Sequence, residues 1–165
     1  MTSRLLVDKI EGKTTASTVQ MPEGSVVQMQ NATLSGAGNT TTSTSFVDTG
    51  LTVNLTPKFA TSKIFVTVYH QMAITASTNA RVDFRLVSGS TELYRMDYYG
   101  IDSNTVGTHQ KNMAGSGVFQ CSDTSQLTFK TQVRKGGTYS NEANIIYYDW
   151  YNNSIHTIQA MEVAQ

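Results

Sequence analysis

The sequence predicts an all-β protein, a jelly-roll-like antiparallel β-sandwich of about nine strands with a short extended N-terminal anchor. Thr is the most frequent residue, with 24 copies, and Tyr, Val and Ile are also common. β-Branched and aromatic side chains favour strands, and the helix-forming residues Leu, Glu, Lys and Ala are not enriched. Several segments place an apolar residue at every second position, which is the period of a strand with one buried face.

The chain of 165 residues is long enough for one domain with its own core, and its polarity comes mainly from uncharged side chains. Thr, Ser, Asn and Gln number 24, 16, 10 and 10, a total of 60 residues. Twelve basic side chains balance twelve acidic ones, so there is no basic field to attract nucleic acid. No segment has the length and apolarity of a membrane helix, so membrane insertion is not expected.

Residues 1–22 differ from the rest and are interpreted as an attachment segment, ahead of a β-sandwich knob over residues 23–165. The segment contains a short apolar cluster formed by Leu5, Leu6, Val7 and Ile10, followed by a polar run that ends in the turn signal Pro-Glu-Gly. The first apolar run stops at Val7, too early for a secretory signal peptide. Because so short a cluster cannot bury its own apolar side chains, we expect it to dock on another surface.

The first two predicted strands are residues 25–33 and 46–56, separated by a Gly/Ser/Thr/Asn loop over residues 34–45. In the second strand Leu51, Val53 and Leu55 alternate with polar residues, as a half-buried strand requires. The triplet Asp-Thr-Gly at 48–50 predicts a bulge or tight turn inside it.

The third and longest predicted strand is residues 63–74, after a turn in which Pro57 ends the preceding ladder because proline lacks an N–H group. One face of this strand should carry Ile64, Val66, Val68, His70, Met72 and Ile74. The other should carry Phe65, Thr67, Tyr69 and Gln71. Because both faces hold apolar residues, the strand is predicted to be central, with its second face partly covered too.

Residues 81–89 and 91–100 are predicted to form a hairpin that turns at Gly89, with Val82, Phe84 and Leu86 facing inward. The polar residues 101–117 are predicted to be a long surface loop. The remaining strands are expected at residues 117–122, 126–138, 143–154 and 155–163.

Reactive side chains are few and isolated in the sequence. Cys121 is the only cysteine, and we interpret it as a small buried residue of a strand rather than a reactive thiol. His70, His109 and His156 lack a second histidine at the spacing of a strand-borne zinc site, so no metal or cofactor is expected. His70 and His156 are interpreted as polar strand positions, and His109 as a loop residue.

An enzyme that acts on polysaccharide is the least favoured of the functional classes, because its paired carboxylates cannot be recognised in the sequence. The carboxylates that could pair in space are Asp83, Glu92, Asp97, Asp102, Asp149 and Glu162, and the sequence does not show whether two of them face each other. There is no Gly-x-Ser-x-Gly elbow, and the Gly-Ser-Gly at 115–117 lacks the helix that a nucleophile loop needs. No catalytic residue is predicted.

Aromatic residues concentrate in two places, around Tyr98 and Tyr99 and around Trp150 and Tyr151. Their side chains combine a stacking face with a polar tip, which suits a sugar ring or a protein partner. Packing inside the sandwich is the favoured interpretation of the aromatic residues as a group, because alternation turns half of any strand inward. Tyr98, Tyr99, Trp150 and Tyr151 are the candidates for a ligand or receptor surface.

Three segments resemble virion-surface proteins of marine bacteriophages, tail-fibre-like or head-decoration-like, especially those of cyanophages. They are SRLLVDKIEGKT with VQMPEGSVVQMQ, then TSFVDTGLTVNLTPKFATSKIFVTV, and finally IQAMEVAQ. The resemblance implies a non-enzymatic, often trimeric virion structural protein, made in the host cytoplasm and exposed on the particle. Since neither a shaft nor a separate docking domain is evident, we expect a capsid decoration protein, head fibre or small tail appendage. Docking would use Leu5, Leu6, Val7 and Ile10.

The alternative is a receptor-binding tail-fibre tip that holds a host surface glycan or protein during adsorption. In this interpretation the aromatic residues at 98–99 and 150–151, with the loop at 101–117, would contact the host. The two interpretations are compatible, because a docked knob can also carry a receptor surface.

Overall fold

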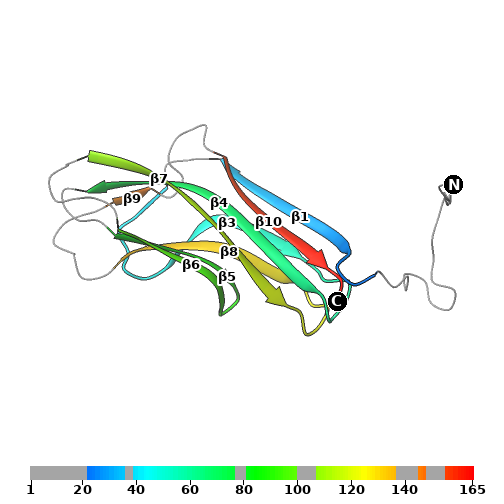
Figure 1. Ribbon diagram of the computed structural model, residues 1–165. Helices are drawn as coiled ribbons and strands as arrows, with labels where there is room; N and C mark the ends of the chain where they lie inside the picture. The colour runs from blue at the N-terminus through cyan, green and yellow to red at the C-terminus, as the bar shows by residue number, and fades with distance from the viewer. Residues whose placement is uncertain (1–21, 36–38, 77–80, 100–106, 137–144, 148–154) are drawn as a thin grey trace, which may run out of the picture.

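The computed structural model describes residues 22–35, 39–76, 81–99, 107–136, 145–147 and 155–165, which form two antiparallel sheets packed face to face (Figure 1). These residues include no helix, and the predicted all-β sandwich is confirmed. Sheet A contains β1 (Val26–Ser35), β2 (Thr40–Thr41), β4 (Lys63–Ala76), β7 (Gly107–Gln120), β9 (Ile145–Tyr147) and β10 (Ile155–Val163). Sheet B contains β3 (Val47–Leu55), β5 (Arg81–Ser88), β6 (Thr91–Tyr99) and β8 (Leu127–Lys135).

The strand pairing is that of a jelly roll, as predicted. The pairs β1·β10, β3·β8, β4·β7 and β5·β6 are nested in the sequence, the outermost strands pairing first and the innermost last. Successive pairs alternate between sheet A and sheet B. A long two-stranded ribbon wound in this way gives two four-stranded sheets, here β1-β10-β4-β7 and β3-β8-β5-β6. The short strand β9 pairs with β4 at residues 73–75, past the end of the pairing of β4 with β10, and β2 pairs with β9.

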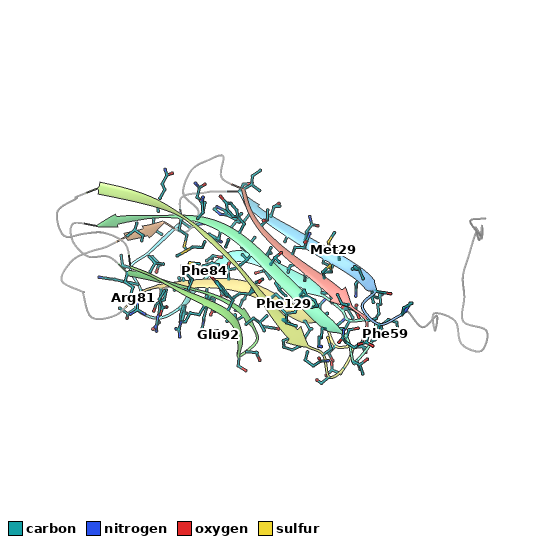
Figure 2. All side chains as sticks on the ribbon, viewed as in Figure 1. Met29, Phe59, Arg81, Phe84, Glu92 and Phe129 are labelled. Carbon is teal, nitrogen blue, oxygen red and sulfur yellow. The ribbon has the colours of Figure 1, made fainter. Side chains whose placement is uncertain are left out.

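The core lies between the two sheets and combines the alternating side chains that the sequence indicated with Met113 of β7, which was predicted in a loop. The fully buried members include Leu51, Leu55, Ile64, Met72, Ile74, Phe84, Leu86, Met113, Phe129 and Ile158. Figure 2 shows Phe84 and Phe129 directed between the sheets, and the ring of Phe129 meets Phe119 edge-on at 5.9 Å between centroids. Burial of each large apolar side chain contributes about 1.5–3 kcal/mol, so this layer is the main source of stability.

The bulge predicted at residues 48–50 is confirmed. Gly50 has a φ of +90°, and the register of β3 with β8 shifts between Asp48 and Thr52. The extra residues turn Thr49 into the core, where its hydroxyl group lies 2.5 Å from that of Thr131. A buried hydroxyl needs such a partner, so the bulge and the threonine pair depend on each other.

The prediction of a surface loop over residues 101–117 is wrong from residue 107 onward. There the chain forms β7, which pairs with β4 along its whole length, from Ala76 opposite Gly107 to Lys63 opposite Gln120. His109, predicted in a loop, therefore lies in a strand. The sequence of β7 lacks apolar alternation, because small residues of this strand allow β6 to approach it closely.

Two glycines show this close approach directly. A Cβ atom at Gly117 would lie 2.6 Å from the Cβ of Leu93, and one at Gly115 would lie 2.3 Å from the ring of Tyr94. The sheets thus meet along β6 and β7, and the Gly-Ser-Gly segment serves packing between strands.

The sandwich has two distinct ends. At one end the chain enters at Pro22 and also finishes, because Gly24 N–H donates to the carbonyl of Ala164 (2.9 Å) and Ala164 N–H donates to Ser25 (3.0 Å). At the opposite end β6 finishes and β7 begins (Figure 1). The termini of the described domain therefore lie far from the end of β6 at Tyr99 and the start of β7 at Gly107.

Candidate interaction face

The structure places only part of the predicted site. Leu5, Leu6, Val7 and Ile10 lie outside the described residues, and so do Trp150 and Tyr151. Tyr98 and Tyr99 are the last residues of β6, opposite Val82 and Arg81 of β5, although their side chains are not among those described. The structure thus gives a backbone position for two of the four residues of the predicted ligand surface.

A different candidate surface stands out on the outer face of sheet A, the face turned away from sheet B. Its register brings Met29, Met161, Phe65 and Val118 side by side across β1, β10, β4 and β7. We call these four side chains the apolar row. Adjacent strands lie about 4.8 Å apart, so the row crosses the sheet over about 14 Å. Figure 2 shows Met29 on this outer side of the sandwich.

The apolar side chains of this face are open to solvent. The exposed fractions are 56% for Met29, 39% for Phe65 and 50% for Val118, and Met161 is half-buried. Tyr69 (41%) and Ile155 (61%) lie further along the same face. Among the described residues, the large exposed apolar side chains gather on sheet A, which is where a protein partner would be expected.

The rest of this face carries mainly hydroxyl and amide groups. From Phe65 toward the end of β4, its described residues include no charged side chain. The next row is Asn31, Gln159, Thr67 and Ser116, and the following one is Thr33, Thr157, Tyr69 and Ala114. The sequence had indicated part of this surface, since Phe65 and Tyr69 were assigned to the second face of their strand. It did not indicate that Met29, Val118 and Met161 would lie beside them.

The outer face of sheet B is very different, because it carries a network of ion pairs. Asp83 is fully buried there, between Arg81 (Nε to Oδ1, 2.8 Å) and Arg134 (Nη2 to Oδ2, 2.7 Å). Arg81 also pairs with Asp97 at 2.8 Å. The ring of Phe46 lies over this network, with the guanidinium carbon of Arg85 at 3.8 Å from its centroid. Asp83 thus lies on the face opposite Val82 and Phe84, and its arginine neighbours bury it.

A chain of polar contacts continues the network to the edge strand β3. Arg85 Nε–H donates to the side-chain oxygen of Gln132 (2.8 Å), and the amide of Gln132 donates to Asp48 (2.5 Å). Lys130 Nζ lies 2.8 Å from the same carboxylate. Partial burial raises the pKa of Asp48, but the hydrogen bonds from Lys130 and Gln132 outweigh it, so the pKa lies below its ordinary value.

A third polar site lies at the end of the sandwich where the chain enters. The carboxylate of Glu162 is fully buried and accepts hydrogen bonds from the backbone N–H groups of Lys58 (2.9 Å) and Phe59 (3.2 Å). The side-chain amide of Gln28 donates to it as well, at 2.6 Å. Glu162 thereby fixes the turn between β3 and β4, where Figure 2 shows Phe59.

His70 and His156 are fully buried in the core, and the apolar alternation of the strand had placed His70 on that inner face. Their rings stack with centroids 4.3 Å apart, and the backbone N–H of Gln71 donates to His156 Nδ1 at 3.0 Å. This hydrogen bond requires an unprotonated Nδ1 in His156. The two histidines were predicted to be ordinary strand residues, and the fold brings them together.

Neither a metal cluster nor a membrane helix is found in the part of the chain that the structure describes. No group of three or more His, Cys, Asp or Glu side chains there could hold a metal ion. No helix of sufficient length and apolarity to span a membrane occurs in those ranges. Cys121 is buried, as predicted, although it follows the last residue of β7 rather than lying in a strand. Burial, followed by the charges of Glu162 and Asp123, raises the pKa of its thiol.

Comparison with known proteins identifies a structural neighbour but no family. No model of a protein family matches the sequence, and no match is found among curated proteins. Among solved structures, dimeric latent PorU from Porphyromonas gingivalis is similar at a TM-score of 0.47 and 11% sequence identity. The similarity covers 88% of this chain and 14% of the PorU chain.

Proposed function

We propose that this chain is a non-enzymatic structural protein of a bacteriophage particle. It is a surface knob, of the capsid decoration, head fibre or small tail appendage type, that docks through its N-terminal segment. The observation that carries this proposal is the end-to-end layout of the sandwich. The chain enters at Pro22, beside Ala164 near the C-terminus, whereas β6 ends and β7 begins at the opposite end of the sandwich (Figure 1).

This layout suits a protein that is held at one end and projects the other. A segment docked on the particle before Pro22 leaves the domain with its entry end toward the particle. The strand ends at Tyr99 and Gly107 then point away from it. Jelly-roll domains are common building units of viral capsids, and that general use of the fold agrees with the proposal.

The segments that resemble phage proteins are also one structural unit. Glu162 of the C-terminal segment binds the backbone of Lys58 and Phe59, in the Thr-Pro-Lys-Phe turn of the central segment. Gln28, from the first segment, donates to the same carboxylate. The described parts of the three resembling segments therefore meet at the carboxylate of Glu162, which supports treating the resemblance as one shared domain.

The test is incorporation into phage particles. Particles formed in the presence of the full chain are purified on a density gradient, and the chain is quantified by mass spectrometry. Wild type should be present, and Leu6→Asp combined with Val7→Asp should remove it. The matched control, Thr14→Asp with Thr15→Asp, adds the same charge outside the apolar cluster and should incorporate normally. Purified particles that lack the wild-type chain would overturn the proposal.

The second candidate function, a receptor-binding tip, is favoured by one observation. Tyr98 and Tyr99 end β6 at the end of the sandwich that lies away from the chain entry. Replacing both by Ala should lower adsorption of particles to host cells without lowering incorporation. Thr91→Ala, at the exposed start of the same strand, is the control. Unchanged adsorption would exclude these two residues from receptor binding.

A further inference from the structure

We propose that the outer face of sheet A is the surface through which copies of this chain associate, with the apolar row at its centre. The inference goes beyond the proposed function and does not depend on where the protein docks. It rests on the exposed apolar side chains of that face, on the polarity of the two sheets and on the area available.

The composition of the face is that of an interface centre. Methionine and aromatic residues are enriched in such centres, and charged residues are depleted. The apolar row and Tyr69 supply methionine and aromatic side chains, and Ile155 adds a further apolar one. From Phe65 toward the end of β4, the described residues of the face carry no charge. Left in water, Phe65 and Val118 would keep much of their apolar surface hydrated, which is unfavourable.

The difference in charge between the two outer faces indicates that sheet A of one copy packs on sheet A of another, rather than on sheet B. The outer face of sheet B carries five basic and four acidic side chains, which are Arg81, Arg85, Arg95, Lys130 and Arg134 with Asp48, Asp83, Glu92 and Asp97. Covering those charges with an apolar surface would remove their water without new partners, which is unfavourable. A second copy of the uncharged face has no such cost. Its amides and hydroxyls, such as Asn31 and Gln159, can also hydrogen-bond with their counterparts, because amides both donate and accept.

The area is sufficient for a stable contact between copies. Four strands at about 4.8 Å spacing and ten residues at about 3.3 Å each give a flat area of about 600 Å². Relief from the side chains raises the accessible area above this figure. A standard interface buries about 800 Å² on each partner, and crystal-packing contacts bury about half of that or less. The face is therefore in the range of a specific interface.

Association also accounts for an unusual property of β4. This strand is central in its sheet and carries apolar residues on both faces, and such strands are normally covered on both. Among the described residues only the inner face is covered, and Phe65 and Tyr69 remain exposed on the other. A neighbouring copy supplies the missing cover. Closed rings are the usual result when copies of one chain associate.

The experiment measures the mass of the purified full chain by light scattering and native mass spectrometry. Wild type should have a mass that is two or three times the 18.1 kDa of one chain. Phe65→Lys combined with Val118→Lys places charges in the apolar row, and the mass should fall at least twofold. Thr128→Lys adds one charge to an exposed strand position of sheet B and should leave the assembly unchanged.

Circular dichroism and urea unfolding show whether the double variant is folded. If it is not, Phe65→Thr with Met161→Thr serves instead, because threonine favours strands and matches the neighbouring Thr67. A wild-type chain that is monomeric at micromolar concentration would overturn the inference. So would an assembly whose mass is the same in wild type and in the folded variant. Phage incorporation is measured separately, so either proposal can fail alone.

Discussion

Glu162 holds Lys58 in place, because its buried carboxylate accepts the backbone N–H of Lys58 at 2.9 Å and 3.1 Å. The two residues are 104 positions apart in the chain, and the contact closes the turn between β3 and β4 against the last strand. Phe59 N–H and the Gln28 amide complete the set of donors. A charge buried without such donors would be strongly unfavourable, so the turn and the carboxylate require each other.

We therefore expect Glu162→Gln to lower the free energy of unfolding by about 1–3 kcal/mol. Glutamine keeps the shape but has one acceptor oxygen fewer, and its amide group would face backbone donors. The measurement is urea unfolding followed by tryptophan fluorescence. Thr157→Ser, on the exposed side of the same strand, is the matched control and should change the midpoint little. An unchanged midpoint in Glu162→Gln would show that the charge is not needed.

Gly117→Ala should destabilise the domain by about 1–3 kcal/mol, which is the usual cost of overpacking. The new methyl group would lie 2.6 Å from the Cβ of Leu93 and 2.9 Å from its carbonyl oxygen. One of these atoms belongs to the backbone of β6, so a side-chain rotation cannot remove the clash. Ser116→Ala is the control, because residue 116 is exposed on the other face of the same strand. Equal thermal midpoints for the two variants would contradict the packing of β6 on β7.

The strands with apolar alternation could be predicted from the sequence, and those without it could not. The inward faces of β4 and β8 follow directly from Ile64 to Ile74 and from Leu127 to Val133. β7 has no such pattern, because its glycines serve the approach of β6. The apolar row was also beyond prediction, since it depends on the register of four strands that are distant in the sequence. Alternation shows which side chains share a face, and pairing alone shows which ones are neighbours.

Asp83→Asn should destabilise the domain more than Asp97→Asn does. Asp83 is fully buried between Arg81 and Arg134, whereas Asp97 is 37% exposed. Loss of a buried partner leaves two guanidinium groups without their acceptor, and because these remain partly exposed we expect about 1–3 kcal/mol. The exposed pair contributes at most about 1 kcal/mol. Urea unfolding of both variants gives the comparison, and equal losses would show that burial of Asp83 adds nothing.

The thiol of Cys121 should react slowly in the folded protein. Burial is the largest cause of its raised pKa, and the charges of Glu162 and Asp123 act in the same direction. At a given pH a raised pKa leaves less thiolate, which is the reactive form. Labelling with iodoacetamide at about pH 8, near the pKa of a free thiol, should therefore be much slower in buffer than in urea. Equally fast labelling in both would contradict the buried position.

The same shift predicts a contribution to stability that is lost in alkaline solution. Because the folded state keeps its proton to a higher pH than the unfolded chain, the contribution is fully present below the unfolded pKa of about 8.5. It declines as the pH rises above that value, since the unfolded chain then loses a proton that the folded chain retains. Urea unfolding of wild type and Cys121→Ala on both sides of this pH isolates the effect from other groups. Wild type should lose more stability than Cys121→Ala between the two conditions, and parallel losses would assign the alkaline change to residues other than Cys121.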